Sequence, residues 1–190
     1  MILRLDLLRH GETEQGGGLR GSLDDALTEA GWAQMRAAVA QAGPWQHIVS
    51  SPLQRCARFS EELAARLDLP MHLEPDLQEL HFGDWEGRSA AQIMETDADG
   101  LGAFWGDPYA FTPPNGEPVA EFSVRVLGAV RRLHQAFAGK RLLLVSHGGV
   151  MRLLLAQARG LPREQLLQVL VEHGALMPIQ VAADGGLTEA

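Results

Sequence analysis

The apolar residues of this chain form short continuous runs that alternate with longer segments of helical periodicity. The short runs fall at 2–8, 47–50, 71–74, 141–146 and 177–182, and each has the length of a buried strand. The segments that we predict to be α-helices fall at 28–42, 51–67, 117–138 and 147–158, with shorter ones at 90–95 and from 163. Strands that alternate with helices predict an α/β fold, here a three-layer α/β/α sandwich around a mostly parallel sheet.

Local signals mark where the first two helices begin and end. Thr28 is a suitable N-cap for the first helix, and Gly43-Pro44 is a strong stop after it. Ser51-Pro52 combines a capping residue with a proline at the first helical position, so we expect it to open the second helix. These boundary residues support the order of strands and helices that the apolar pattern predicts.

Between residues 75 and 118 the periodic pattern weakens. One short helical segment, 90–95, stands out there, and a loop rich in proline and glycine follows it, Pro113-Pro114-Asn115-Gly116. We expect residues 80–117 to form a small inserted lobe of helix and loop on a single domain that spans residues 1–190.

Composition limits the classes of partner. Hydrophobic residues make up 46% of the chain and charged residues 21%, which are ordinary values for a globular domain. The formal net charge of −8 argues against nucleic acid and anionic membranes as partners, because both select for basic faces. The charge is compatible with a small phosphorylated metabolite, which senses only the local field of its pocket. We expect a monomer or a homodimer.

Cysteine usage and the first residues bear on the cellular location. Cys56 is the only cysteine, so no disulfide can form within the chain and no two-cysteine metal site exists. Arg4 and Asp6 interrupt the first apolar run, which is unlike a signal peptide. The later apolar segments are too short to span a bilayer, and the expected location is the cytoplasm.

Two histidines occupy the same kind of position in the predicted fold. His10 precedes Gly11 at the end of the first strand, and His147 precedes Gly148 at the end of the fourth. Ligands of open α/β sheets bind beyond the carboxyl ends of the strands, so we expect both histidines at the rim that holds the site. A helix that begins at His147 directs free N–H groups towards an anion.

Two arginines and a carboxylate complete a candidate phosphate site. Arg9 precedes the first of these histidines, and Arg55 lies in the first turn of the second helix, again just beyond a strand. Guanidinium groups bind phosphate oxygens in bidentate fashion and keep neighbouring imidazoles neutral, as a nucleophilic histidine requires. Glu79 is the candidate proton donor for a leaving alcohol, and we expect Phe82 and Trp85 to enclose it enough to keep it protonated.

Five sequence blocks carry a resemblance to a known family. They are Arg9-His10-Gly11-Glu12-Thr13, Asp24-Asp25-Ala26-Leu27-Thr28-Glu29-Ala30-Gly31, Ser50-Ser51-Pro52-Leu53-Gln54-Arg55, Glu79 with Gly83-Asp84-Trp85-Glu86-Gly87, and Ser146-His147-Gly148-Gly149. In this order they resemble the histidine phosphatase superfamily, also called the phosphoglycerate-mutase-like family. The resemblance covers nearly the whole chain, and five blocks in family order are far more specific than any single tripeptide.

The resemblance implies a phosphoglycerate-mutase-like fold and a covalent mechanism. It assigns phosphate binding to Arg9, Arg55 and Gly148, and catalysis to His10, Glu79 and His147. The first histidine would attack phosphorus and the glutamic acid would protonate the departing oxygen. Water would then hydrolyse the phosphohistidine, with the same carboxylate as the base. The family uses no metal ion and no other cofactor, because arginine and histidine neutralise the charge that magnesium carries elsewhere.

Within the superfamily, the residues after Glu79 favour a phosphatase over a mutase. Mutases usually carry Arg-His-Tyr-Gly there, whereas this chain has Leu80-His81-Phe82-Gly83. The loop that begins at Pro113, together with Arg125, is similar to α-ribazole phosphatases. This similarity favours removal of the 5′-phosphate of α-ribazole in cobalamin nucleotide-loop assembly. A broad-specificity sugar-phosphate phosphatase, a phosphoglycerate mutase and a non-catalytic phosphate-binding module are the alternatives.

Two positions depart from the family pattern. Gly16 stands where many members have an asparagine that helps to hold the phosphate, and Ala26 replaces a usual proline. The first departure bears directly on the phosphate site. We advance the hypothesis that Arg20 compensates for the missing amide, in which case Arg20→Ala raises KM sharply.

Other residues near these blocks have ordinary interpretations. Arg58 is expected at the helix surface, and Glu86 is expected to order its loop. Cys56 lacks the phosphate-cradling loop of a cysteine phosphatase, so we expect it to be a small core residue. Trp85 and Trp105 are expected to pack in the core, although either ring is able to stack on a substrate.

The remaining histidines divide into two groups. His81 lies close to the candidate acid in sequence and is a candidate for lining the substrate entrance. No pattern links the others to the site, and we expect surface or hydrogen-bonded structural positions for His47, His72, His134 and His173.

Overall fold

A six-stranded sheet with the strand order β3-β2-β4-β1-β5-β6 forms the centre of the computed structural model, which describes residues 1–190. The strands are β1 (Leu3–Arg9), β2 (His47–Ser50), β3 (Met71–Leu73), β4 (Arg141–Ser146), β5 (Leu176–Val181) and β6 (Leu187–Glu189). β1 to β4 are parallel, whereas β5 runs antiparallel to β1 and β6 antiparallel to β5. The expected mostly parallel sheet is confirmed, and β6 adds a strand that was not predicted.

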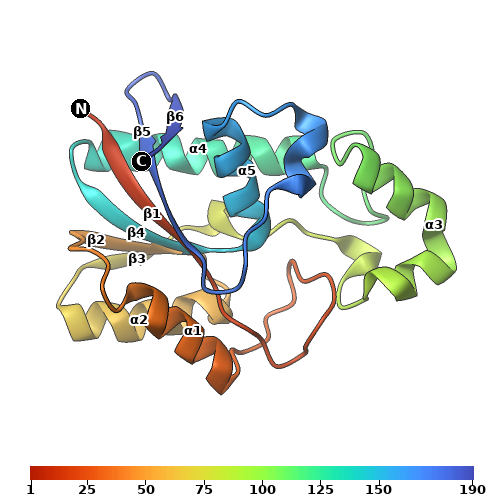
Figure 1. The fold of residues 1–190 in the computed structure, drawn as a ribbon, viewed down its shortest axis with the longest axis horizontal. Helices are drawn as coiled ribbons and strands as arrows, with labels where there is room; N and C mark the ends of the chain where they lie inside the picture. The colour runs from red at the N-terminus through yellow and green to blue at the C-terminus, as the bar shows by residue number, and fades with distance from the viewer.

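Helices cover both faces of this sheet (Figure 1). They are α1 (Glu29–Val39), α2 (Gln54–Leu67), α3 (Ala90–Gly106), α4 (Val119–Phe137) and α5 (Gly148–Ala158), with 3-10 turns η1 (Pro75–Leu77), η2 (Gly83–Trp85) and η3 (Arg163–Gln168). α1 and α2 pack on one face and α4 and α5 on the other. The three-layer α/β/α sandwich is therefore confirmed.

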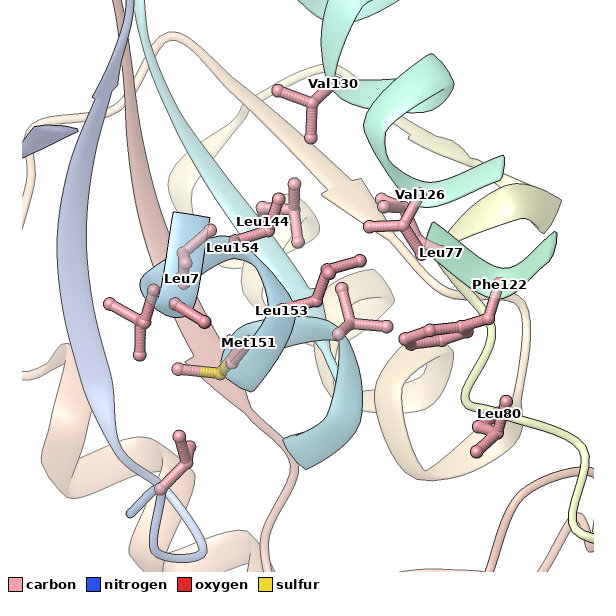
Figure 2. Close-up of a cluster of buried hydrophobic side chains, with 14 of the residues drawn as sticks. Leu7, Leu77, Leu80, Phe122, Val126, Val130, Leu144, Met151, Leu153 and Leu154 are labelled. Carbon is pink, nitrogen blue, oxygen red and sulfur yellow. The ribbon is translucent and has the colours of Figure 1, made fainter. Parts of the chain in front are cut away.

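Alternation along the strands divides the hydrophobic core into two clusters. Leu7 and Leu144 join the cluster beneath α4 and α5, which Figure 2 shows with Met151 among its members. Leu8 and Val145, the next residue along each strand, join the cluster beneath α1 and α2. Because both faces of the sheet are covered, successive residues in the second half of β1 and through β4 are apolar. Full burial of each such side chain contributes about 1.5–3 kcal/mol.

The helix boundaries match the sequence signals in one case and not in another. Thr28 caps α1, and its hydroxyl accepts a hydrogen bond from the N–H of Gly31 at 3.0 Å. The prediction that Ser51-Pro52 opens α2 is wrong, because α2 begins at Gln54 with Leu53 in the capping position and no side-chain cap. The Ser51 hydroxyl instead lies in the candidate active site.

The segment 80–117 contains η2 and α3, which lie beyond one end of the sheet (Figure 1). α3 is longer than the predicted 90–95, because a second helical stretch continues past a non-helical residue, Asp97. The description of this segment as an inserted lobe on a single domain stays a prediction. None of the helices has the length and apolar composition needed to cross a bilayer.

Candidate active site

The two site histidines lie side by side because β1 and β4 are adjacent and in register. Arg9 pairs with Ser146 at the carboxyl ends of these strands, and one more residue along each chain gives His10 and His147. The N–H of His10 donates to the carbonyl of Ser146 at 3.0 Å. The two imidazole rings are 5.3 Å apart and meet edge to face. Topology therefore brings together two residues that are far apart in sequence.

His10 is buried and held in one tautomer. Its Nδ1 lies 2.8 Å from the carbonyl oxygen of Gly11. A carbonyl can only accept, so Nδ1 carries the hydrogen of the neutral ring and Nε2 keeps a free lone pair. Burial, followed by the positive charge of Arg55, places the pKa of His10 well below its ordinary value of 6.5. The ring is thus neutral at pH 7, with Nε2 available as a nucleophile.

His147 is fully buried, and a serine hydroxyl orients it. Its Nε2 lies 2.7 Å from Oγ of Ser51. Burial comes first, and the neighbouring Arg55 second, among the causes that place the pKa of His147 well below 6.5. The sequence indicates Ser51 only as a helix cap. A serine directly beyond a strand end was the available signal, since the site lies at that edge of the sheet.

Cys56 borders the same histidine without the features of a nucleophile. Its Sγ lies 3.8 Å from Nε2 of His147, and the side chain belongs to the cluster beneath α1 and α2. Burial raises the pKa of Cys56 to about 12, so the thiol stays protonated at pH 7. The interpretation of Cys56 as a small core residue is confirmed.

Two guanidinium groups approach His10 and retain unused donors. Arg55 is fully buried, and its terminal nitrogens donate to the carbonyls of Leu23 and Gly21. Arg9 donates through Nη1 to the carbonyl of Val171 at 2.6 Å. The Nε atoms of both arginines are buried and have no hydrogen-bond partner. Both arginines are close enough to lower the pKa of His10. Two buried cationic donors beside a neutral imidazole match a tetrahedral oxyanion.

Glu79 is held against the N-terminus of α5. Its Oε2 accepts from the N–H of Gly149 at 2.8 Å, and its Oε1 accepts from the N–H of Leu80 at 3.0 Å. A Cβ on Gly149 would lie 2.2 Å from Oε1, so only glycine allows this approach. Arg125 fixes the backbone of the same segment, because its Nη2 donates to the carbonyl of Glu79 at 3.0 Å.

The two glycines after His147 have different surroundings. Gly148 is the first residue of α5, so its N–H has no intrahelical partner and is free to bind an anion. Gly149 supplies the N–H that holds Glu79. The phosphate-binding role of Gly148 stays a prediction, and Gly149 is a residue that the family block contained without an assigned role.

Glu79 lines a small cavity of about 50 Å³ with Phe82 and other apolar residues. Trp85 is absent from this lining, because it packs against Phe104 and Phe111 in the core. The expectation that Phe82 borders the carboxyl is confirmed, and the same expectation for Trp85 is wrong. Trp85 packs in the core as expected, whereas Trp105 is half exposed, which contradicts the core position expected for it.

Polar contacts hold the segment that follows the glycine-rich loop. Glu86 accepts from the N–H groups of Gly21 and Ser22 at 2.9 and 2.8 Å, so it orders the loop as expected. Arg20 pairs through Nε with Asp25 at 2.8 Å and donates to the carbonyl of Gly16 at 3.0 Å. Arg20 is therefore engaged within the loop. The hypothesis that it contacts the phosphate stays a prediction.

His173 is exposed, as expected, and its ring lies 5.6 Å from that of His10, a proximity that the sequence did not indicate. The other interpretations agree with the structure. His47 and His72 bond to each other, His134 bonds to the carbonyl of Met1, and Arg58 is exposed. His81 is exposed and accepts from the N–H of Gly83, and its place at a substrate entrance stays a prediction.

Comparisons with known proteins identify relatives of this chain. The chain is 33% identical over 183 residues to the adenosylcobalamin/α-ribazole phosphatase of Salmonella typhimurium, covering 94% of this chain and 91% of the relative. It is 33% identical over 172 residues to the glucosyl-3-phosphoglycerate phosphatase of Mycolicibacterium vanbaalenii, covering 85% and 76%. The crystal structure of the α-ribazole phosphatase from Shigella flexneri superposes with a TM-score of 0.82 at 32% identity, covering 98% and 94%. The profile of branch 1 of the histidine phosphatase superfamily matches residues 5–189, and this chain belongs to that family.

Proposed function

We propose that the protein is a phosphomonoesterase that transfers the phosphoryl group of its substrate to Nε2 of His10. The observation that carries the proposal is the state of this ring, in which Nδ1 is bonded to Gly11 and burial keeps the imidazole neutral. A neutral imidazole with a free Nε2 is a nucleophile, and the arginines beside it are suited to a phosphate dianion. Membership of the histidine phosphatase superfamily supports this chemistry.

The reaction follows from the positions of the other groups. Nε2 of His10 attacks phosphorus while Arg9, Arg55 and His147 stabilise the charge on the equatorial oxygens. Glu79 gives a proton to the departing alkoxide, and each of its oxygens keeps a second lone pair beside its N–H contact. A water molecule then attacks the phosphohistidine, and Glu79 accepts a proton from that water. Inorganic phosphate leaves and neutral His10 is regenerated.

We propose α-ribazole 5′-phosphate as the substrate. Two of the compared proteins carry α-ribazole phosphatase in their names, and each aligns with more than nine-tenths of this chain. The second candidate is a sugar-phosphate phosphatase, which the similarity to a glucosyl-3-phosphoglycerate phosphatase favours. A phosphoglycerate mutase and a non-catalytic phosphate-binding module are further alternatives, and the residues after Glu79 argue against the mutase.

Phosphate release from a panel of monoesters tests both the phosphatase activity and the choice of substrate. The panel contains α-ribazole 5′-phosphate, glucosyl-3-phosphoglycerate, 3-phosphoglycerate and phenyl phosphate, each assayed with a chelator present. A kcat/KM for α-ribazole 5′-phosphate at least about tenfold above the others, a difference of about 1.4 kcal/mol, is expected. Preference for glucosyl-3-phosphoglycerate would replace this substrate by the second candidate. Release from none of the four by wild type would contradict the phosphatase proposal itself.

A further inference from the structure

A third histidine, His173, lies beside the nucleophile in a segment that hydrogen bonds hold in place. The N–H of Gly174 donates to the carbonyls of Arg9 and His10 at 3.2 and 3.4 Å. The side chain of Arg9 reaches back to the carbonyl of Val171 at 2.6 Å. Arg152, on α5, donates to the carbonyl of Val169 at 3.0 Å. The segment 169–174 is thus held against the carboxyl end of β1 through Gly174 and Val171 and against α5 through Val169, and His173 lies within it.

The ring of His173 faces both the nucleophile and solvent. Its centre is 5.6 Å from that of His10, at an interplanar angle of 43°. The residue is exposed, whereas His10 is buried. His173 therefore lies beside the buried nucleophile at a solvent-exposed position. In-line attack by His10 places the departing oxygen on the far side of phosphorus, so it is a hydroxyl elsewhere on the alcohol portion that this ring is able to meet.

The charges around His173 favour a neutral ring. Partial burial lowers the pKa of His173, the positive charges of Arg9 and Arg20 lower it further, and the carboxylate of Glu12 opposes them. A neutral imidazole offers one hydrogen-bond donor and one acceptor. A phosphate dianion offers acceptors only and is better matched by the arginines. A hydroxyl group both donates and accepts, so it is the natural partner of such a ring.

We propose that His173 is a specificity-determining residue that exchanges hydrogen bonds with a hydroxyl group on the alcohol portion of the substrate. The site would then select sugar and polyol monoesters over aryl monoesters that lack such a hydroxyl. This inference rests on the proposed phosphomonoesterase function, because it concerns the alcohol that the reaction releases. It goes beyond that function by assigning selectivity to a residue outside the five family blocks.

The test is a ratio of rates measured on two substrates. The first is the hydroxyl-bearing monoester of the panel that wild type hydrolyses best, and the second is phenyl phosphate. His173→Phe keeps a ring beside His10 and removes both hydrogen bonds, whereas His173→Gln keeps a donor and an acceptor. The ratio of the two kcat/KM values is unaffected by the fraction of folded enzyme, since both substrates report on the same sample. His134→Phe, remote from the site, is the matched control.

The expected result is a drop in this ratio of roughly 5- to 50-fold in His173→Phe, mostly through KM of the hydroxyl-bearing substrate. His173→Gln should recover most of the ratio, and His134→Phe should leave it unchanged. An unchanged ratio in His173→Phe would overturn the proposal, whether both rates fall in parallel or neither falls. Hydrolysis of phenyl phosphate alone by wild type would overturn it as well. Failure of the proposed function is separate, because it would show as no phosphate release by wild type from any monoester of the panel, or as hydrolysis of phenyl phosphate by His10→Ala.

Discussion

Burial keeps His10 and His147 neutral, and this state makes the stability of the protein sensitive to acid. Both rings have folded-state pKa values below the 6.5 of an unperturbed histidine. Below about pH 6.5 the unfolded chain therefore binds protons that the folded chain does not. The free energy of unfolding consequently decreases as the pH is lowered. Above pH 6.5 both states are neutral at these positions, and the two histidines add no slope.

Urea denaturation between pH 5 and 8 measures this effect. We expect the free energy of unfolding to fall below pH 6.5 by up to about 1.4 kcal/mol per pH unit for each of the two histidines. His147→Gln should remove the contribution of one histidine to the slope of the free energy of unfolding against pH. His134→Gln serves as the control. Equal slopes in wild type and His147→Gln would show that the buried ring does not resist protonation.

The hydroxyl of Ser51 is the contact that orients His147, and its loss should affect the reaction more than the fold. Ser51→Ala removes the 2.7 Å bond to Nε2 of a fully buried ring. A hydrogen bond of this kind contributes about 0.5–1.5 kcal/mol, so kcat/KM should fall by roughly 2- to 13-fold. Ser50→Ala is the matched control, because Ser50 is equally buried and bonds only to the carbonyl of Ser51. Equal losses in the two variants would contradict the positioning role.

At the scale of elements, the first turn of α5 places the proposed acid. Gly149→Ala puts a methyl group 2.2 Å from Oε1 of Glu79, so the carboxyl must move away from the departing oxygen. Since general acid catalysis is worth ~10²–10⁴ in rate, we expect kcat to fall by on the order of 10². Burst kinetics with phenyl phosphate should show a slower first step.

Gly128→Ala, in the middle of α4, is the control for the change of glycine to alanine in a helix. Its added methyl group lies 3.6 Å from the nearest atom, a side-chain nitrogen of Arg132. This variant should be more stable by about 0.5–1 kcal/mol and fully active. A Gly149→Ala enzyme with wild-type kcat would contradict the placement of Glu79 as the acid.

Element boundaries also show where local sequence signals are sufficient. Thr28 caps α1 as predicted, because its hydroxyl is able to accept from the N–H of Gly31 while it donates to the carboxylate of Glu12. Ser51 has an equally favourable capping sequence, but its hydroxyl bonds to His147, and α2 begins at Gln54 without a side-chain cap. The competing partner comes from a distant strand, so a local signal could not reveal it. The second half of α3 was missed for a different reason, since Asp97 interrupts its helical pattern.

At the scale of the whole molecule, the order of the strands assembles the site. Burial on both faces makes the central strands β1, β2 and β4 predictable from short, largely apolar runs, and the glycines that follow two of these strands indicate the rim of the site. The position of His173 beside His10 was not predicted, because it depends on β5 running antiparallel to β1. That direction places the start of β5 at the carboxyl end of β1. His173 and Gly174 precede the last predicted strand. They indicate a site residue only if the direction of that strand is already known.

The central claim is that phosphate passes through a covalent bond to Nε2 of His10, and trapping that intermediate tests it most directly. The enzyme is mixed with a ³²P-labelled monoester of the panel, quenched in alkaline denaturant within one turnover, and the labelled peptide is identified. We predict a label on His10 that survives base and is lost in acid, and we predict neither label nor hydrolysis in His10→Ala. Hydrolysis by His10→Ala at the wild-type rate, or turnover of wild type with no labelled His10, would contradict the mechanism.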